Sequence, residues 1–231
     1  MKRAASWLLL AVGGLCGCVP TLTQGGEDLN FLQDIPAVSA EVRSENLLPL
    51  TPGNYWTMRG VSGEYRGLDK IVVGNPVQIL GRKGTMVQLL RDGALWRQEV
   101  YQQDSNGLWL VAFGEKKADI LQLDPPMQLL KPTFHEGDEI SWSGKIHFQK
   151  NSYPATAFCR VSFQDSVQTP KGRFQTYRLD SVISMDRGKG KPLFFPAVRW
   201  LSRDIGFIQR SFADGGRPVV QQLDSYMVKD K

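Results

Sequence analysis

The chain has 231 residues and a formal net charge of +5 at pH 7, and 42% of its residues are hydrophobic. This length is enough for one domain with a sizeable hydrophobic core. The excess of positive charge is too small to indicate a nucleic-acid-binding protein. The sequence contains no phosphate-binding loop, Cys-x-x-Cys pair, His-Glu-x-x-His motif or Gly-x-Ser-x-Gly elbow, so these catalytic and metal-binding signatures are absent.

The first 17 residues have the pattern of a secretory signal peptide. Lys2 and Arg3 precede a mostly apolar run over residues 4–15. As a helix this run would span only ~18 Å, which is too short for a bilayer core of about 30 Å. We therefore expect residues 1–17 to be removed, and the loss of the two cations would lower the net charge from +5 to +3.

The end of this segment, Leu15-Cys16-Gly17-Cys18, resembles the lipobox of bacterial lipoproteins. The resemblance implies that Cys18 receives a diacylglyceryl thioether, that the signal peptide is cut before it and that the new amine is acylated. Two or three acyl chains anchor a protein far more firmly than one. Val19 stands where inner-membrane lipoproteins commonly have Asp, so the resemblance implies an outer-membrane protein that faces the periplasm. The alternative is an ordinary cleaved signal in which Cys18 is incidental.

Residues 18–46 predict a flexible tether between this anchor and a β domain over residues 47–231. The segment contains Gly25-Gly26 and two prolines, and it shows little sustained periodicity.

The β domain is predicted from short β-prone runs that alternate with turn signals, as in an antiparallel meander. Asp92-Gly93 and Asn106-Gly107 are typical of two-residue hairpin turns, which need positive φ at both positions. Residues 121–131 contain Pro125-Pro126, and we interpret them as a crossing connection rather than a helix. The predicted strands are residues 55–58, 69–73, 85–90, 95–102, 108–113, 139–148, 155–163, 174–183, 198–201, 206–212 and 219–227.

The apolar residues in these strands predict which faces are buried. Residues 108–113 are apolar in both phases, which predicts a strand covered on both sides. In residues 141–148, by contrast, Trp142, Ile146 and Phe148 alternate with polar residues, so one side of that strand should face solvent.

Few residues offer chemistry. His135 and His147 are the only imidazoles, and we interpret residues 135–139 as a turn before a strand rather than a metal site. Strand alternation places Cys159 on the same face as the apolar Val161, which predicts a buried structural thiol. We therefore expect a protein that is not an enzyme and has no cofactor and no metal.

The one concentrated basic loop is Arg187-Gly188-Lys189-Gly190-Lys191-Pro192. Arg187, Lys189 and Lys191 would suit contact with an anionic surface such as lipid headgroups. A solvated hairpin tip has the same composition and is the alternative.

Three further segments resemble a broad group of bacterial envelope lipoproteins of unassigned function. Residues 48–57 are similar to the group's Pro-Leu-x-x-Gly-Asn-x-Trp opening, and residues 169–177 to its Pro-x-Gly-x-Phe-x-Thr hairpin. Residues 200–208 resemble its ending, a Trp followed after five residues by Gly and two hydrophobic residues. The resemblance implies an all-β, strongly curved antiparallel sheet, for which we consider an unclosed barrel like those of lipoprotein carriers.

An unclosed barrel must cover its concave apolar face, because large exposed apolar patches are unusual. The sequence thus favours a lipid-anchored protein that binds an apolar ligand or an envelope protein in this face. The alternative is a structural or assembly subunit of an envelope complex, and a hydrolytic enzyme is favoured least.

Overall fold

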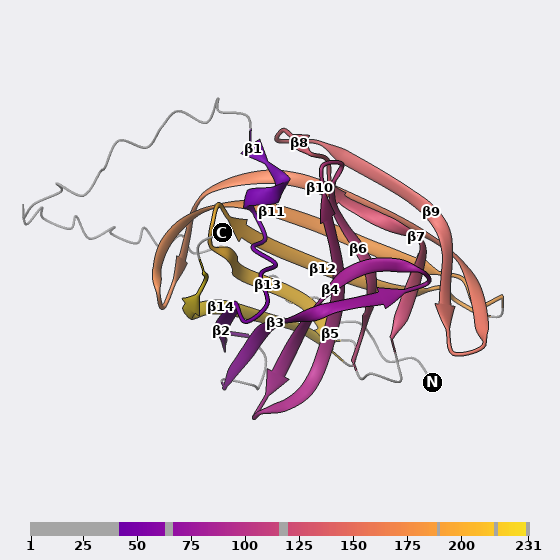
Figure 1. The fold of residues 1–231 in the computed structure, drawn as a ribbon, viewed down its shortest axis with the longest axis horizontal. Coiled ribbons are helices and arrows are strands. Elements are labelled where there is room, and N and C mark those ends of the chain that lie inside the picture. The colour runs from indigo at the N-terminus through magenta and orange to yellow at the C-terminus, as the bar shows by residue number, and fades with distance from the viewer. Residues whose placement is uncertain (1–41, 63–66, 116–119, 189, 215–216, 230–231) are drawn as a thin grey trace, which may run out of the picture. The chain divides into compact units, whose positions relative to one another are not determined.

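The computed structural model describes residues 42–229 apart from 63–66, 116–119, 189 and 215–216 (Figure 1). The described residues form antiparallel strands and one short 3-10 helix, η1 (Ser44–Asn46). They contain no helix that is long and apolar enough to cross a membrane. The all-β prediction is therefore confirmed for this part of the chain.

Twelve strands form a closed antiparallel barrel in the order β10-β11-β12-β13-β14-β2-β3-β4-β5-β6-β7-β9. A separate two-stranded sheet pairs β1 with β8. The strands are β1 (Val42–Arg43), β2 (Tyr55–Gly60), β3 (Leu68–Ile79), β4 (Arg82–Arg91), β5 (Ala94–Asp104), β6 (Gly107–Gly114), β7 (Leu121–Leu130), β8 (Thr133–Phe134), β9 (Glu139–Phe148), β10 (Asn151–Thr169), β11 (Gly172–Met185), β12 (Leu193–Ser202), β13 (Gly206–Asp214) and β14 (Arg217–Met227).

The predicted burial patterns are confirmed. In β9, Trp142 and Ile146 are buried while Ser141, Ser143 and Lys145 are exposed. The β6 strand is covered on both sides. Its Val111 and Ala112 form a second small core with Val100 of β5, and apolar residues of the β3–β4 hairpin pack against that core.

The prediction that residues 121–131 form a connection is wrong, because they contain β7. Pro125 and Pro126 lie where the pairing with β6 shifts, between the Ala112–Gln122 pair and the Leu110–Met127 pair. A proline in a strand is tolerated at such a bulge, since it cannot donate a ladder hydrogen bond.

The prediction of an unclosed barrel is also wrong, and β7 is the reason. Residues 122–124 of β7 pair with residues 145–147 of β9, and β9 pairs with β10 along a long hairpin. This short seam closes the barrel. The indole Nε1 of Trp142 donates to the carbonyl of Pro125 at 2.9 Å and ties the two strands together beside the seam.

The described part of the chain includes residues that precede the predicted boundary at residue 47. Residues 42–46, the end of the predicted tether, form β1 and η1. The amide of Ser44 donates to Pro132, and the side chain of Gln103 donates to the carbonyl of Ser44. The rest of the predicted tether and residues 1–17 lie outside the described residues.

Buried apolar side chains pack together in the barrel interior. Trp56 of β2 and Phe207 of β13 pack edge to face at 5.3 Å, and both are fully buried. Leu47 and Leu48 are also fully buried in the same core. One cavity lies at an end of the barrel where several strands begin and end.

Candidate functional site: the rim cavity

A cavity of about 470 Å³ opens at one end of the barrel, and we call it the rim cavity. Strands β6, β9, β11 and β13 end there, and β7, β10 and β12 begin there. Its size lies in the range of small-molecule sites. It is lined by Arg97, Phe113, Gly114, Glu115, Leu121, Phe148, Tyr153, Met185, Arg187, Leu193, Phe194, Phe195 and Ala213.

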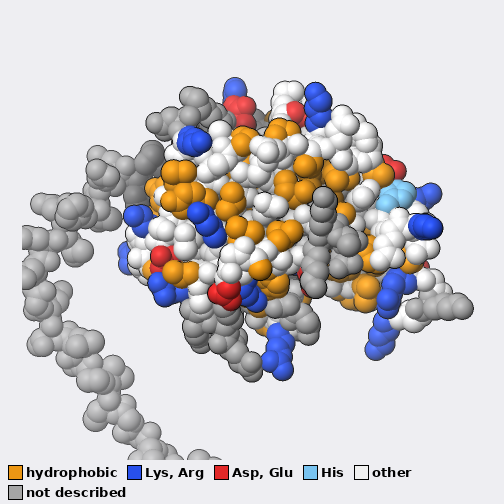
Figure 2. Space-filling model, turned by 60° about the horizontal axis from the view of Figure 1, so that its bottom comes forward, with side chains coloured by type: hydrophobic (Ala, Val, Ile, Leu, Met, Phe, Trp, Pro, Cys, Tyr) orange, Lys and Arg blue, Asp and Glu red, His pale blue; other side chains and the backbone are white. Residues whose placement is uncertain are grey.

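The walls of the rim cavity are mainly apolar. Phe113 of β6 and Phe195 of β12 meet edge to face, with 5.2 Å between their ring centroids. Phe194 is 62% exposed, which is unusual for such a large apolar side chain. On the face shown in Figure 2, hydrophobic side chains gather in the middle and Lys and Arg side chains lie around them.

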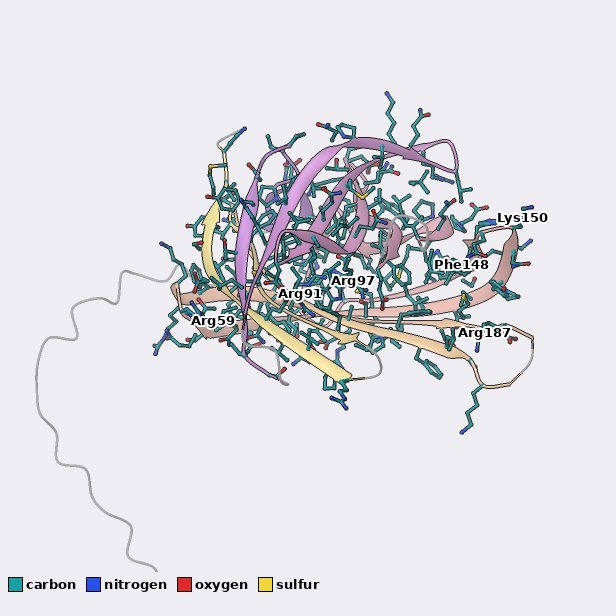
Figure 3. The ribbon with its side chains drawn as sticks, turned by 90° about the horizontal axis from the view of Figure 1, so that it is seen from below. Arg59, Arg91, Arg97, Phe148, Lys150 and Arg187 are labelled. Atoms are coloured by element: carbon teal, nitrogen blue, oxygen red, sulfur yellow. The ribbon has the colours of Figure 1, made fainter. Side chains whose placement is uncertain are left out.

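Three lining residues carry charge: Arg97, Arg187 and Glu115. Arg97 belongs to β5 and is largely buried, with only 12% of its side chain exposed. Arg187 lies beyond the end of β11 and is exposed. In Figure 3, Phe148 and Arg187 lie toward the same side of the view, with Arg97 nearer the middle.

Behind Arg97 lies a group of buried polar residues, which we call the buried charge cluster: Glu99, Tyr101, Arg199 and Arg210. Oε1 of Glu99 lies 2.9 Å from Nη2 of Arg210, 3.4 Å from Nη2 of Arg199 and 3.5 Å from Nε of Arg97. The Tyr101 hydroxyl donates to the other carboxylate oxygen of Glu99 and accepts from Nε of Arg199 at 2.9 Å. One carboxylate thus faces three guanidinium groups.

The cluster strongly favours the charged form of Glu99. Burial alone would raise the pKa of this carboxyl, but the charges of Arg210, Arg199 and Arg97 outweigh burial and hold the pKa far below its usual value. Burial and the neighbouring carboxylate raise the pKa of Tyr101, so its hydroxyl keeps its proton and remains a donor. Glu99 is therefore ionised near neutral pH, whereas burial lowers the pKa of Arg210 from its ordinary value and its pairing with Glu99 opposes this effect.

A second buried acid lies on the neighbouring strands. The carboxylate of Asp69 accepts two hydrogen bonds of 3.1 Å from Arg91, which pairs with it across β3 and β4. The guanidinium of Arg91 stacks on Trp96, and Trp96 contacts Phe212 on the far side of the barrel. This pair is balanced in charge, whereas the cluster around Glu99 is not.

The residues singled out from the sequence are scattered. Cys18 and Lys189 lie outside the described residues. Arg187 lines the rim cavity, whereas Lys191 is exposed and does not line it. Both belong to the connection between β11 and β12, and contact with an anionic surface stays a prediction.

The histidines and the free thiol are also placed. Residues 135–138 form the predicted turn before β9, and in it the Asp138 carboxylate accepts a hydrogen bond from the amide of His135 at 3.1 Å. His147 lies 3.6 Å from Asp124 on the surface, and neither residue lines the rim cavity. Cys159 is buried as predicted, and its thiol donates to the carbonyl of Leu129.

Sequence reasoning missed the buried charge cluster. A usable signal was present at Arg210, because this ionisable residue lies on the apolar face of a predicted strand. Arg210 stands between Ile208 and Phe212 in its phase, and Glu99 shares a phase with Tyr101. An ionisable residue in a buried phase needs a partner, but which strand supplies that partner depends on the barrel.

No model of a protein family and no curated protein matches this chain. Solved structures with some similarity include a protein from Bacteroides fragilis that is proposed to be exported and has a YmcC-like fold. Its TM-score is 0.48 and its identity 11%, over 78% of this chain and 98% of that chain. A proposed lipoprotein from Parabacteroides distasonis has a TM-score of 0.40 and an identity of 13%, over 78% of this chain and 97% of that chain. The hypothetical lipoprotein YmcC from Escherichia coli has a TM-score of 0.36 and an identity of 12%, over 79% of this chain and 87% of that chain.

Proposed function

We propose that this chain is a lipid-anchored protein of the bacterial cell envelope whose barrel binds the apolar part of a small ligand in the rim cavity. The rim cavity is the observation that carries the proposal. Its walls bring apolar side chains from seven strands to one opening. A concave and mostly apolar site with a few polar groups is the usual form of a small-molecule site.

Binding is tested with 1-hexadecanol, a neutral and largely apolar probe, and the full chain carrying Cys18→Ala in detergent-free buffer. Native mass spectrometry should detect one bound molecule. The double variant Phe148→Ser/Phe194→Ser removes two partly exposed cavity walls, and we expect it to bind at least about tenfold more weakly, because each ring contributes apolar contact.

Leu80→Ser is the matched control. Leu80 is 47% exposed at the β3–β4 turn and does not line the rim cavity, so its loss should leave binding unchanged. Equal weakening in the control and the double variant, or no binding to the parent chain, would overturn the proposal.

The anchor rests on Cys18 and is tested separately by fractionation of cells. The parent chain should sediment with the membranes, and Cys18→Ala should not, because the acyl chains are the proposed attachment. Cys159→Ala is the control that should stay with the membranes, since this thiol is buried in the barrel. We also propose the outer membrane, facing the periplasm, and Val19→Asp should then move the protein to the inner membrane.

A second function, as a subunit of an envelope complex, is favoured by an apolar row on the outer face of the barrel. Phe158, Val182 and Pro196 are paired neighbours across β10, β11 and β12, and all three are exposed. A photocrosslinker at Val182 should capture one stoichiometric envelope protein in cells if this function is correct. Recovery of only uncrosslinked monomer would count against it.

A further inference from the structure

The charges around the rim cavity indicate more about its ligand than its apolar walls do. This inference rests on the proposed function, because it concerns the ligand of the same cavity. Arg97 contributes to both regions, since it lines the rim cavity and lies 3.5 Å from Glu99 in the buried charge cluster. The question is whether its charge is already neutralised.

Glu99 cannot neutralise all its neighbours. Its carboxylate faces the guanidinium groups of Arg97, Arg199 and Arg210, which leaves a formal excess of two positive charges. Arg97 is the most distant of the three, so its electrostatic attraction to this carboxylate is the weakest. Because its side chain is largely buried, its charge acts in a medium of lower dielectric constant than water.

Arg210 shows the same excess of donors. Its Nε and Nη1 atoms are buried and have no hydrogen-bond partner among the residues that the structure describes. The guanidinium carbons of Arg210 and Arg97 lie 5.0 and 4.9 Å from the ring centroid of Phe212. Ala213, the next residue, lines the rim cavity. An anion beside Arg97 would thus reduce the repulsion among these cations.

We propose that the ligand is an amphiphile with one anionic group, and that this group binds to Arg97 while the hydrocarbon lies against Phe113, Phe195 and Leu121. Glu115 is exposed at the opening, where water screens its charge. Arg187 is exposed as well, and we assign it a weaker contribution for the same reason. A carboxylate and a phosphate share the required chemistry, so a free fatty acid and an anionic phospholipid are the two sources.

The test compares palmitate with 1-hexadecanol, which have equal chain lengths and differ in charge, on the Cys18→Ala chain in detergent-free buffer. We expect palmitate to bind at least about tenfold more tightly, because a hydrogen bond to a charged group is stronger than one to a neutral group. In Arg97→Gln the ratio of the hexadecanol Kd to the palmitate Kd should fall to about one. Arg97→Lys should restore part of this ratio, because lysine keeps the positive charge.

Arg59→Gln is the matched control. Arg59 pairs with Asp224 at 2.7 Å and lies on the opposite side of Figure 3 from Arg187, so its loss should leave the ratio unchanged. Incubation with phosphatidylglycerol vesicles, followed by native mass spectrometry, identifies the source. Capture of the phospholipid or of palmitate supports the proposal, and thermal unfolding checks that each variant is folded.

The two proposals fail in different ways. If palmitate and hexadecanol bind equally, the anionic group is wrong and the apolar site stands. If Arg187→Gln abolishes the ratio and Arg97→Gln does not, the assignment to Arg97 is wrong. If neither probe binds, the proposed function itself fails.

Discussion

The carboxylate of Glu99 on β5 and the guanidinium of Arg210 on β13 meet inside the barrel, with 2.9 Å between Oε1 and Nη2. These strands are not neighbours in the sheet, because β14, β2, β3 and β4 lie between them. The pair therefore links two distant parts of the barrel wall through its interior. It also leaves buried cations in excess, which makes Glu99 the most sensitive residue of the cluster.

Replacing Glu99 by Gln should destabilise the fold strongly. The variant leaves two buried guanidinium groups without a carboxylate, and breaking one partner of a buried ion pair costs about 3–5 kcal/mol. Glu139→Gln is the control, because Glu139 is exposed and pairs with Arg160 only at 3.9 Å, and it should cost less than about 1 kcal/mol. Urea denaturation measures both losses. Equal losses would show that the cluster does not stabilise the barrel.

The contribution of Glu99 to stability should depend on pH. Its pKa in the folded protein is lowered from the ordinary value of 4.5, so the unfolded chain binds the proton more readily. The stabilisation is complete above this value and is lost as pH falls toward the folded pKa. The difference in unfolding free energy between the parent and Glu99→Gln should thus stay constant from about pH 7 to about pH 5 and shrink from about pH 5 to about pH 3. A difference that stays constant would contradict the lowered pKa.

Gly206→Ala should lower the free energy of unfolding, because the position combines a strained backbone conformation with close contacts to an added Cβ. Gly206 has φ of +91°, and an added Cβ would lie 2.6 Å from Cζ2 of Trp56 and 3.1 Å from Cδ of Pro49. We expect a loss of about 2–5 kcal/mol. Gly81 has a similar φ of +74° but no atom within 4 Å of such a Cβ, so Gly81→Ala isolates the strain. It should lose about 1–2 kcal/mol in the same denaturation experiment.

Gly144→Ala should open the seam that closes the barrel. The added Cβ would lie 2.5 Å from the carbonyl oxygen of Asp124, which belongs to the backbone of β7. Hydrogen exchange at residues 122–124 and 145–147 should become at least about tenfold faster. Gly74→Ala is the control, because its Cβ would meet its nearest atom at 3.4 Å. Unchanged exchange at the seam would mean that β9 tolerates the displacement.

Cys159 should react slowly with maleimide in the folded protein. Burial raises the pKa of its thiol to about 12, so the reactive thiolate is almost absent near neutral pH. Labelling should be fast in urea and slow without it. Rapid labelling of the native chain carrying Cys16→Ala and Cys18→Ala, in which Cys159 is the one remaining thiol, would show that the barrel opens at β10.

Strand positions were largely predictable because local signals specify them. Asp92-Gly93 and Asn106-Gly107 mark hairpin turns, and alternation predicted which side of β9 is buried. The prediction failed at residues 121–130, where Pro125-Pro126 indicated a break. A bulge between β6 and β7 accommodates both prolines, and a bulge depends on the neighbouring strand.

The candidate site was far less predictable. Arg187 was singled out for its basic loop, whereas Arg97 and Glu99 attracted no notice in a strand of mixed polarity. Their importance arises from Arg199 and Arg210, about a hundred residues later in the chain. Only barrel closure brings these strands together, so no local pattern reports the excess charge.

The sequence by itself determined the strands, most turns, the buried thiol and the segment ending at Cys18 that resembles a lipobox. These follow from hydrophobic period, backbone propensity and short motifs, which act over a few residues. The tertiary structure alone decided that β7 closes the barrel, that apolar side chains pack together in its interior and that a charged, apolar cavity lies at its rim. Those features depend on contacts between distant strands, because packing and electrostatic energies are set by separation in space and not along the chain.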